Sequence, residues 1–275
     1  MRIFFRLLII SAVCFMVLSC ADRSAERAGS LLQEGRALAE QGSFNASRLL
    51  LDSLHSAYPK CVEQRMQAKA LEDSIVYVES LRDADYADSL LASLMPKADS
   101  LLRFFRYEKN ERYEDVGKYV HRLLQTGSNA QRCFLQAYTT DARETIVKSY
   151  YYGAAKLTVR EAELTSDEEQ CRKSGSDHTF EAEGWHSVMT TEGDDALEML
   201  NFVSSHISDR LRVKLSDGVE GSKSKAAVFY LNDNEKQALQ ATYQLGIVMR
   251  DIRQLEDIQR IARARIEKYE QKYML

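Results

Sequence analysis

Turn-forming and cross-linking residues are scarce in this sequence, whose 275 residues include 2 prolines, 12 glycines and 5 cysteines. So few helix breakers exclude a collagen-like or low-complexity chain and favour long helices. So few cysteines exclude a disulfide scaffold. Charge of one sign is also lacking, because 37 basic and 41 acidic residues leave a net charge of −4. No nucleic-acid partner is therefore expected.

The longest apolar run lies at the amino terminus. Arg2 and Arg6 precede an apolar segment from Leu7 to Leu18, which only Ser11 interrupts. About twelve residues are too few to cross roughly 30 Å of hydrocarbon comfortably. The segment therefore predicts a signal peptide over residues 1–19 and not a transmembrane helix.

The next residues, Val17-Leu18-Ser19-Cys20, resemble the lipobox of bacterial lipoproteins, in which a small residue precedes a lipidated cysteine. The resemblance implies that the Cys20 thiol receives a diacylglycerol and that cleavage frees an amine for a further fatty acid such as palmitate. Each buried methylene contributes about 0.8 kcal/mol, so two or three chains give lasting attachment to a membrane. An ordinary secretory signal with an unmodified cysteine is the alternative.

Residues 20–30 are expected to form the lipidated cysteine and a polar linker. A lipoprotein signal followed by a helical start, with no enzyme motif, resembles uncharacterised envelope lipoproteins of Bacteroides-like bacteria. The resemblance implies a protein of the cell envelope whose first partner is the membrane, through lipid on Cys20. The outer membrane is expected, on its periplasmic or its surface face.

Residues 25–59 have the pattern of a helical hairpin, because apolar residues recur at helical spacing on both sides of Gln41-Gly42-Ser43. The order of residue types resembles one tetratricopeptide (TPR) repeat, with Gly35 where the helices cross and Ser47 in place of the usual alanine. No second copy follows, whereas solenoids need about three repeats. An interaction surface and a purely structural hairpin both remain open.

A longer helical pattern covers residues 61–109. Its seam alternates by four and three residues through Tyr77, Leu81, Ala84, Asp88, Leu91, Met95, Ala98, Leu102 and Phe105. Pro96 is expected to kink or divide this helix, because proline lacks a backbone donor. Residues 112–125 are predicted to continue as helix, so residues 31–130 together form the hairpin and a stalk helix.

Residues 131–231 are predicted to form an α+β head with its own core. A helix is expected from Asp194-Asp195 to Ile207, and a polar loop over residues 165–176. Alternating and β-branched residues predict strands beginning near Cys133 and over residues 144–152, 156–163, 177–185, 210–216 and 225–231.

Residues 232–275 predict a C-terminal stalk helix that Asn232-Asp233 caps. Its seam contains Ala238, Ala241, Leu245, Val248, Ile252, Leu255, Gln259, Ala262, Ile266, Tyr269 and Tyr273. The expected fold is α+β and mainly helical, with a long antiparallel coiled-coil stalk from residues 65–109 and 233–273 and the head inserted between them. A parallel homodimer through residues 238–273 is the rival arrangement.

The sequence contains no phosphate-binding loop, nucleophile elbow or spaced zinc-ligand motif, and no cofactor or catalytic residue is expected. His178 and His186, with Cys171 and Glu181 or Glu183 nearby, are the one group considered for a metal, and no metal site is predicted there. Cys61, Cys133 and Cys171 permit at most one disulfide and are expected to be buried thiols.

Tyr150 and Tyr152, with Trp185, form the most suggestive group, because aromatic residues on a sheet face can receive a ligand. The leading hypothesis is a lipid-anchored envelope protein with a non-catalytic scaffold role and a protein partner. The alternative is a module that binds a glycan, a peptide or a lipid through these aromatics. An enzyme with a dispersed site is a second alternative.

Overall fold

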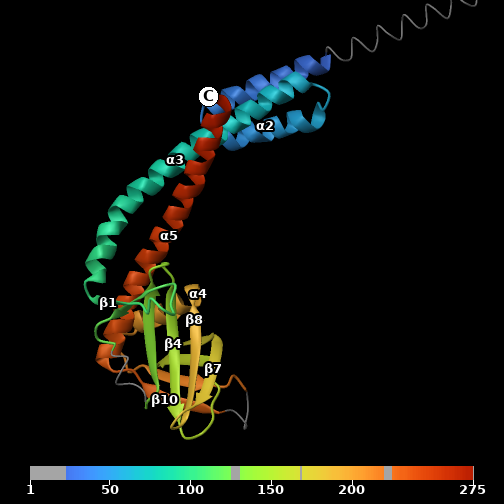
Figure 1. Cartoon of the computed structure of the whole chain (residues 1–275). Helices are drawn as coiled ribbons and strands as arrows, with labels where there is room; N and C mark the ends of the chain where they lie inside the picture. The colour runs from blue at the N-terminus through green and yellow to red at the C-terminus, as the bar shows by residue number, and fades with distance from the viewer. Residues whose placement is uncertain (1–22, 125–130, 168, 220–224, 275) are drawn as a thin grey trace, which may run out of the picture. The chain divides into compact units, whose positions relative to one another are not determined.

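The computed structural model describes residues 23–124, 131–167, 169–219 and 225–274 (Figure 1). The predicted signal peptide and the lipidation site Cys20 lie outside these residues. Helices and two antiparallel sheets make the fold a mixed α and β one. No helix in the described residues is both long enough and apolar enough to cross a membrane.

The chain forms two compact units, and each long helix contributes to both of them. The first, called the helical unit below, comprises the described residues up to Ala87 together with those from Ile258 onward. The second, called the α+β unit, runs from Asp88 to Asp257.

The helical unit begins with a hairpin, as predicted. A helix over residues 23–40 is followed by a turn and by α2 (Phe44–Ala57). At the crossing, the buried Ser47 hydroxyl donates a 2.7 Å hydrogen bond to the Gly35 carbonyl oxygen. A Cβ on Gly35 would lie 3.1 Å from Leu51 Cδ2, so the small residue permits the close approach. Leu51 packs into a core that also contains Ala28, Leu32, Leu54, Ala68 and Ile75.

The third helix, α3 (Val62–Leu102), passes through Pro96 without a break. Pro96 was expected to kink or divide this helix, and of these two effects the division was wrong. Pro96 lies on the exposed side of α3, where water can satisfy the carbonyl group that proline leaves without a donor.

The seam of α3 also differs from the predicted one. Ala84, Leu91 and Ala98 face inward as expected, but Leu81, Asp88 and Met95 are exposed. The positions one residue earlier are buried or half-buried instead: Ser80, Ala87 and Leu94. The small Ser80 and Ala87 permit close packing, and for this reason they were less visible as core residues in the sequence.

The last helix, α5 (Asp233–Tyr273), follows its predicted seam closely, and only Tyr273 among the predicted members is exposed. Within the helical unit, Tyr77 stacks on Tyr269, and Asp73 bonds Tyr273. The segments of α3 and α5 in this unit therefore run antiparallel. In the α+β unit, Ala98 of α3 shares a core cluster with Leu245, Val248, Met249 and Ile252 of α5.

Strands replace the helix that was predicted after residue 102. The segments β1 (Phe105–Glu108) and β2 (Lys118–His121) pair antiparallel, so the helical interpretation of residues 103–109 and of 112–125 was wrong for the residues that the structure describes, which end here at residue 124. Both segments are rich in aromatic and β-branched residues, which favour strands. A Cβ on Gly117 would lie 2.1 Å from the Tyr107 hydroxyl oxygen, so this glycine allows the hairpin to close.

The larger sheet has six strands in the order β1-β2-β3-β4-β8-β7. It adds β3 (Phe134–Thr140), β4 (Thr145–Gly153), β7 (Ser176–Glu181) and β8 (Trp185–Glu192). The strand expected over 177–185 is therefore a hairpin of two strands, whose turn contains Gly184 with φ +138°.

The smaller sheet has the order β10-β9-β5-β6. It contains β5 (Glu161–Ser166), β6 (Glu169–Ser174), β9 (Arg212–Ser216) and β10 (Ala226–Tyr230). The strand β6 replaces the polar loop expected over 165–176, because an edge strand can expose polar side chains. Residues 156–160 are not a strand, although Leu157 and Val159 are buried. The Val159 amide donates to the side-chain hydroxyl of Ser187 in β8 instead of to a backbone carbonyl of a paired strand.

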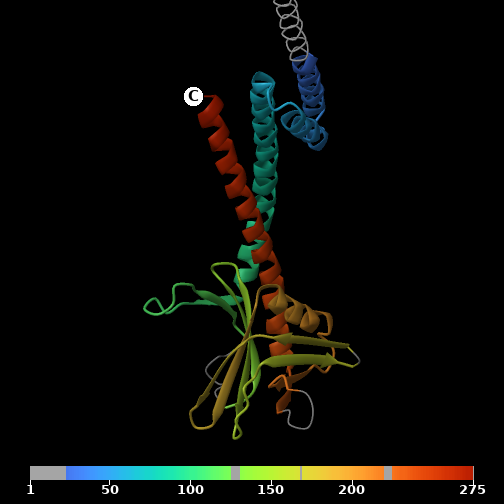
Figure 2. The same cartoon turned by 90° about the vertical axis from the view of Figure 1, so that its right-hand side faces the viewer.

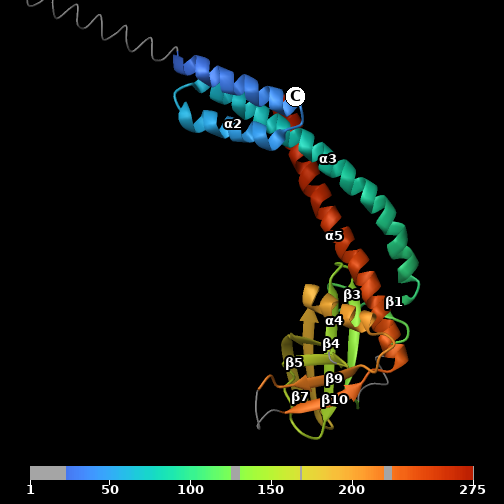
Figure 3. The ribbon, with the colours of Figure 1, turned by 180° about the vertical axis from the view of Figure 1, so that it is seen from behind.

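The two sheets share one core with α4 (Gly193–Ser205) and the start of α5. Figure 2 shows the sheets from the side, and Figure 3 shows the smaller sheet from behind. Leu135 and Met189 come from the larger sheet, Leu164 and Val213 from the smaller one, and all are buried. The expected thiols Cys61, Cys133 and Cys171 are free and half-buried.

Candidate functional site

The outer face of the six-stranded sheet is the candidate binding surface. Along β4, Thr145, Val147, Ser149 and Tyr151 point into the core, and the residues between them point outward and are half-exposed. In Figure 1, β4, β8 and β7 lie toward the viewer, and no described helix crosses in front of them. We call this surface the open face.

The strand register gathers aromatic residues on the open face from four strands. Tyr150 pairs with Phe134 of β3 and with Val188 of β8, and Tyr152 pairs with His186. His186 pairs in turn with Phe180 of β7. Because directly paired residues lie on the same face of a sheet, these side chains share the open face. Phe134 is buried there, whereas Tyr150, Tyr152 and His186 are half-buried and Phe180 is exposed.

The rings on the open face stack on one another. Phe134 and Tyr150 have ring centroids 4.3 Å apart and an interplanar angle of 6°. Phe180 and His186 lie 4.9 Å apart at 2°, and Tyr152 lies 5.0 Å from His186 on a tilted plane. The ring faces are therefore directed largely at each other, and Phe180 remains 42% exposed.

Burial shifts the pKa values of polar groups at one end of the open face. Burial raises the pKa of Tyr138 to about 12 and also raises the pKa of Tyr150, so both phenols stay neutral. The Tyr150 hydroxyl donates a 3.2 Å hydrogen bond to Gln136. Burial, followed by the nearby charge of Lys118, lowers the pKa of Lys148, whose ammonium group lies 5.7 Å from the Tyr138 ring centroid.

The aromatic residues predicted as a binding group do not form one site. Tyr150 and Tyr152 share the open face, but Trp185 pairs with Gly153 and therefore lies on the opposite face. There the Trp185 ring packs against the core, with the Lys156 ammonium 4.8 Å from its centroid. Trp185 was grouped with the tyrosines as an aromatic residue of a sheet face, but it begins β8, and strand alternation places its neighbour His186 on the open face instead.

Histidines of the open face do not indicate a metal site. His178 and His186 both lie on this face, and His186 Nε2 is 2.9 Å from the Ala182 carbonyl oxygen. In the part of the chain that the structure describes, no three histidine, cysteine or carboxylate side chains converge well enough to hold a metal.

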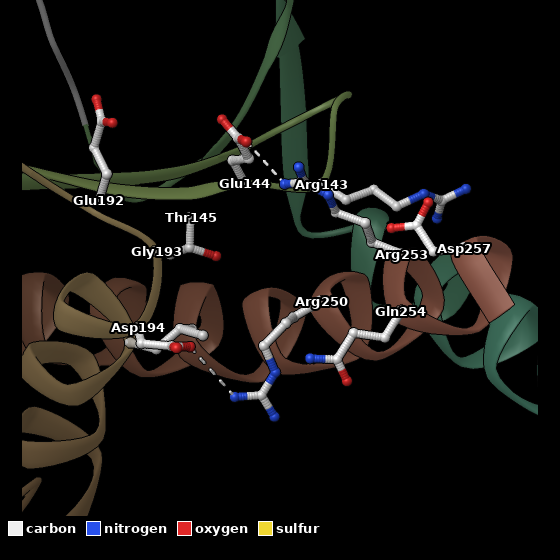
Figure 4. Close-up of a pocket in the computed structure, with 11 residues that line it drawn as sticks. Arg143, Glu144, Thr145, Glu192, Gly193, Asp194, Arg250, Arg253, Gln254 and Asp257 are labelled. Atoms are coloured by element: carbon white, nitrogen blue, oxygen red, sulfur yellow. Dashed lines mark hydrogen bonds and ion pairs between the residues drawn. The ribbon is translucent and has the colours of Figure 1, made fainter. Parts of the chain in front are cut away.

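A charged cleft of about 450 Å³ lies elsewhere in the α+β unit, between the start of β4, the start of α4 and α5 (Figure 4). Three arginines and four carboxylates line it. Arg253 pairs with Glu144 at 2.8 Å, and Arg250 lies 4.0 Å from Asp194. The third arginine, Arg143, has φ +63° and pairs with Glu256 at 2.6 Å.

Because opposite charges pair across this cleft, its arginines connect α5 to the β3–β4 hairpin and to α4. Asp194 and Asp195, which were expected to cap α4, lie in its first turn, where they match the helix dipole. The N-cap residue itself is Glu192, whose side chain forms no capping bond. Asp195 instead accepts a 2.7 Å hydrogen bond from Lys173.

The residues of the open face that sequence reasoning missed are Phe134, Phe180 and His186. The alternation of β4 alone indicates the outward position of Tyr150 and Tyr152. The strand order and register decide which residues of β3, β7 and β8 lie beside them.

Comparison with models of protein families, with curated protein sequences and with solved structures finds no match to this chain. The open face and the contacts around it are therefore the basis for a functional proposal.

Proposed function

We propose that this chain is a lipid-anchored protein of the cell envelope, which binds a partner protein through the open face of its α+β unit. The proposed role is binding and not catalysis. The observation that carries it is the aromatic surface formed by Tyr150, Tyr152, Phe180 and His186. Aromatic side chains provide large apolar area at low entropic cost and are enriched at protein interfaces.

The ring geometry favours a protein partner over a glycan. Sugars bind aromatic residues mainly against the ring face, whereas Phe134 and Tyr150, and also Phe180 and His186, stack face to face within the sheet. The ring edges of the half-buried and exposed members, Tyr150, His186 and Phe180, are then the parts available to a ligand. Their polar groups already bond within the chain, as the Tyr150 hydroxyl does to Gln136 and His186 Nε2 to the Ala182 carbonyl oxygen. A partner protein can pack against ring edges, so the geometry supports this choice.

Lipid attachment at Cys20 forms the other half of the proposal. It is supported by the apolar segment before Cys20 and by the lipobox-like residues Val17-Leu18-Ser19. The outer membrane is the proposed location. The proposal also includes a TPR-like character for the hairpin of residues 25–59 and coiled-coil pairing of α3 with α5 within each unit.

Metabolic labelling with a radioactive fatty acid tests the anchor. The wild-type chain should incorporate the label, and the Cys20→Ser variant should lose it because the acceptor thiol is gone. Cys61→Ser is the matched control and should keep the label. Labelling of Cys20→Ser at the wild-type level would rule out lipidation at this residue.

Site-specific photocrosslinking in intact envelopes tests the open face. A benzophenone amino acid in place of Tyr152 should form an adduct with a defined protein. The same probe in place of Tyr230, which is 48% exposed on the smaller sheet, is the matched control and should not. The adduct at position 152 should weaken when Phe180→Ala removes the exposed ring that stacks on His186, the neighbour of Tyr152.

An adduct with carbohydrate at position 152 would show that the open face binds a glycan and not a protein. Equal adducts at positions 152 and 230, or none at position 152, would show that the open face is not the binding surface.

A further inference from the structure

The helical unit contains a second cleft, of about 350 Å³, between the first turns of α3 and the last turns of α5. The α5 residues that line it recur at helical spacing on one face: Arg265, Lys268, Tyr269, Lys272 and Tyr273. Lys69 and Asp73 of α3 lie on the other side. All of these residues belong to the helical unit.

The charges that line this cleft are unequal. Four cations, Lys69, Arg265, Lys268 and Lys272, meet one carboxylate, Asp73. The cleft of the α+β unit contains four carboxylates beside its three arginines, so the two clefts differ in the sign of their charge. The excess of positive charge in the helical unit indicates an anionic ligand.

Two of the four cations already have partners within the unit. Lys272 Nζ donates to Asp73 at 2.8 Å, and Lys69 Nζ lies 3.0 Å from Glu72. Burial alone would raise the pKa of Asp73, but hydrogen bonds from Lys272 and Tyr273 outweigh it and lower that pKa. Asp73 is therefore ionised and holds Lys272 in place near neutral pH.

The other two cations are available to a ligand. Among the described residues, no hydrogen bond or ion pair engages the Arg265 guanidinium or the Lys268 ammonium. Both are exposed at the cleft and stand three residues apart on α5. The arginine guanidinium can donate two parallel hydrogen bonds, and the lysine ammonium adds a compact positive charge beside it. Together they suit a phosphate group, which offers several oxygen acceptors.

Tyr269 and Tyr273 line the cleft with their rings tilted to one another, and Tyr269 also stacks on Tyr77. Tyr77 and Tyr269 have centroids 4.4 Å apart, and Tyr269 and Tyr273 have centroids 4.7 Å apart. The Tyr273 hydroxyl donates a 2.8 Å hydrogen bond to Asp73, and the Tyr77 hydroxyl lies 3.4 Å from Glu270. These contacts hold the α3 and α5 segments together, so the unpaired cations sit on a preorganised surface.

We propose that the helical unit binds a phosphate-bearing ligand in this cleft, with Arg265 and Lys268 as its principal contacts. The ligand is either a phospholipid headgroup or a soluble phosphate compound, since both present the same chemistry. This inference is independent of the proposed function, because the open face belongs to the α+β unit. Failure of either proposal leaves the other intact.

Calorimetric titration of the full chain in nonionic detergent micelles tests the proposal with two probes. Sodium pyrophosphate represents a soluble phosphate, and micelles doped with phosphatidylglycerol represent a headgroup. The wild-type chain should bind at least one probe, with an affinity that falls as salt is raised. Binding of pyrophosphate alone identifies a soluble ligand, and binding of doped micelles alone identifies a headgroup.

The double variant Arg265→Gln/Lys268→Gln should weaken binding by at least about tenfold. The matched control Arg27→Gln/Arg36→Gln removes the same charge from exposed positions of the same unit, outside the cleft, and should change affinity less than about twofold. Arg265→Lys/Lys268→Arg should retain most of the binding, and circular dichroism should show that all variants fold. Binding of neither probe, or equal weakening by the two charge-removing variants, would overturn the proposal.

Discussion

Gly246 lies where α5 passes close to the sheet and to α4. A Cβ at this position would lie 2.5 Å from Thr145 Oγ1 and 2.9 Å from Leu197 Cδ2. Glycine within a helix costs about 1 kcal/mol relative to alanine, so its presence here is explained by the close packing that it permits. One residue thus determines how near α5 can approach the start of β4.

We predict that Gly246→Ala destabilises the α+β unit by about 1–2 kcal/mol, because overpacking outweighs the gain in helix propensity. Urea unfolding followed by fluorescence measures this change, since Trp185 is the single tryptophan and reports on this unit. Gly29→Ala, where a Cβ would meet no atom within 4 Å, should leave the Trp185 transition unchanged. An unaltered midpoint for Gly246→Ala would contradict the packing argument.

His206 connects the end of α4 to two carboxylates. Its Nδ1 lies 2.9 Å from Asp209 Oδ2, and its Nε2 lies 3.1 Å from Glu169 Oε2. The hydrogen bond with Asp209 raises the pKa of His206 above its usual 6.5; burial opposes this shift and Glu169 adds to it. The charged imidazolium is therefore favoured more in the folded state than in the unfolded one.

We predict that the stabilising contribution of His206 is complete below pH 6.5 and is lost as the pH rises through its higher folded-state pKa. Urea unfolding of wild type and His206→Gln, at about pH 5.5 and about pH 8.5, measures it. The advantage of wild type over the variant should shrink at the higher pH. Burial lowers the pKa of His121, which acts in the opposite direction, but this histidine is the same in both proteins. An advantage that does not change with pH would exclude the role of protonated His206.

At the scale of elements, α5 begins with a reciprocal capping box. Asn232 Oδ1 accepts a hydrogen bond from the Glu235 amide, and Glu235 Oε2 accepts one from the Asn232 amide, each at 2.9 Å. Glu235 also pairs with Arg132 at 2.6 Å, just before β3. This arrangement begins the helix and connects it to the sheet, and it agrees with the cap predicted from Asn232-Asp233.

We predict that Asn232→Ala lowers the free energy of unfolding of the α+β unit by about 1 kcal/mol, because an amide at the start of α5 loses its acceptor. Asn234→Ala, an exposed position in the first turn, is the matched control and should change stability by less than about 0.5 kcal/mol. Equal effects of the two substitutions on urea unfolding would show that the capping bond contributes little.

At the scale of the whole molecule, the chain buries the seam of α5 by itself. Leu245 and Ile252 are fully buried in the α+β unit, and Ala262 is 2% exposed in the helical unit. A parallel homodimer through residues 238–273 would need these side chains at its own interface. Contacts within the chain already bury these side chains.

We therefore predict that the chain is a monomer in detergent solution over a wide range of protein concentrations. Analytical ultracentrifugation under density-matched conditions measures the mass of the protein alone. A dimer mass that persists on dilution would favour the parallel homodimer, and in that case the contacts between Tyr77 and Tyr269 would have to separate.

Several elements could be predicted because their signals are local. The alternation of residues 144–152 identifies β4, and the repeat of three and four identifies the seam of α5. The strands β1 and β2 were missed because each is only four residues long, too short to show alternation despite its aromatic and β-branched residues. The strand β6 was missed because it is polar and lies at a sheet edge. For α3, small residues such as Ala87 made the buried positions inconspicuous.

Parts of the two candidate sites could likewise be predicted from local patterns, and other parts could not. The outward direction of Tyr150 and Tyr152 follows from the alternation of one strand, and the shared face of Arg265, Lys268 and Lys272 follows from the period of one helix. No local pattern shows that Trp185 lies behind the sheet or that Lys69 and Asp73 complete the basic cleft. Those positions depend on pairing between distant segments.

The sequence by itself determined the two long helices, the α5 seam, the hairpin at the amino terminus and the prediction of a lipidated Cys20. Only the tertiary structure decided the strand order, the aromatic neighbours of Tyr150 and the two clefts of opposite charge. The physical reason is that helical and strand periods arise from geometry within about ten residues. Register and packing arise from contacts between residues far apart in the chain, and a shift of one residue reverses the face on which every side chain of a strand lies.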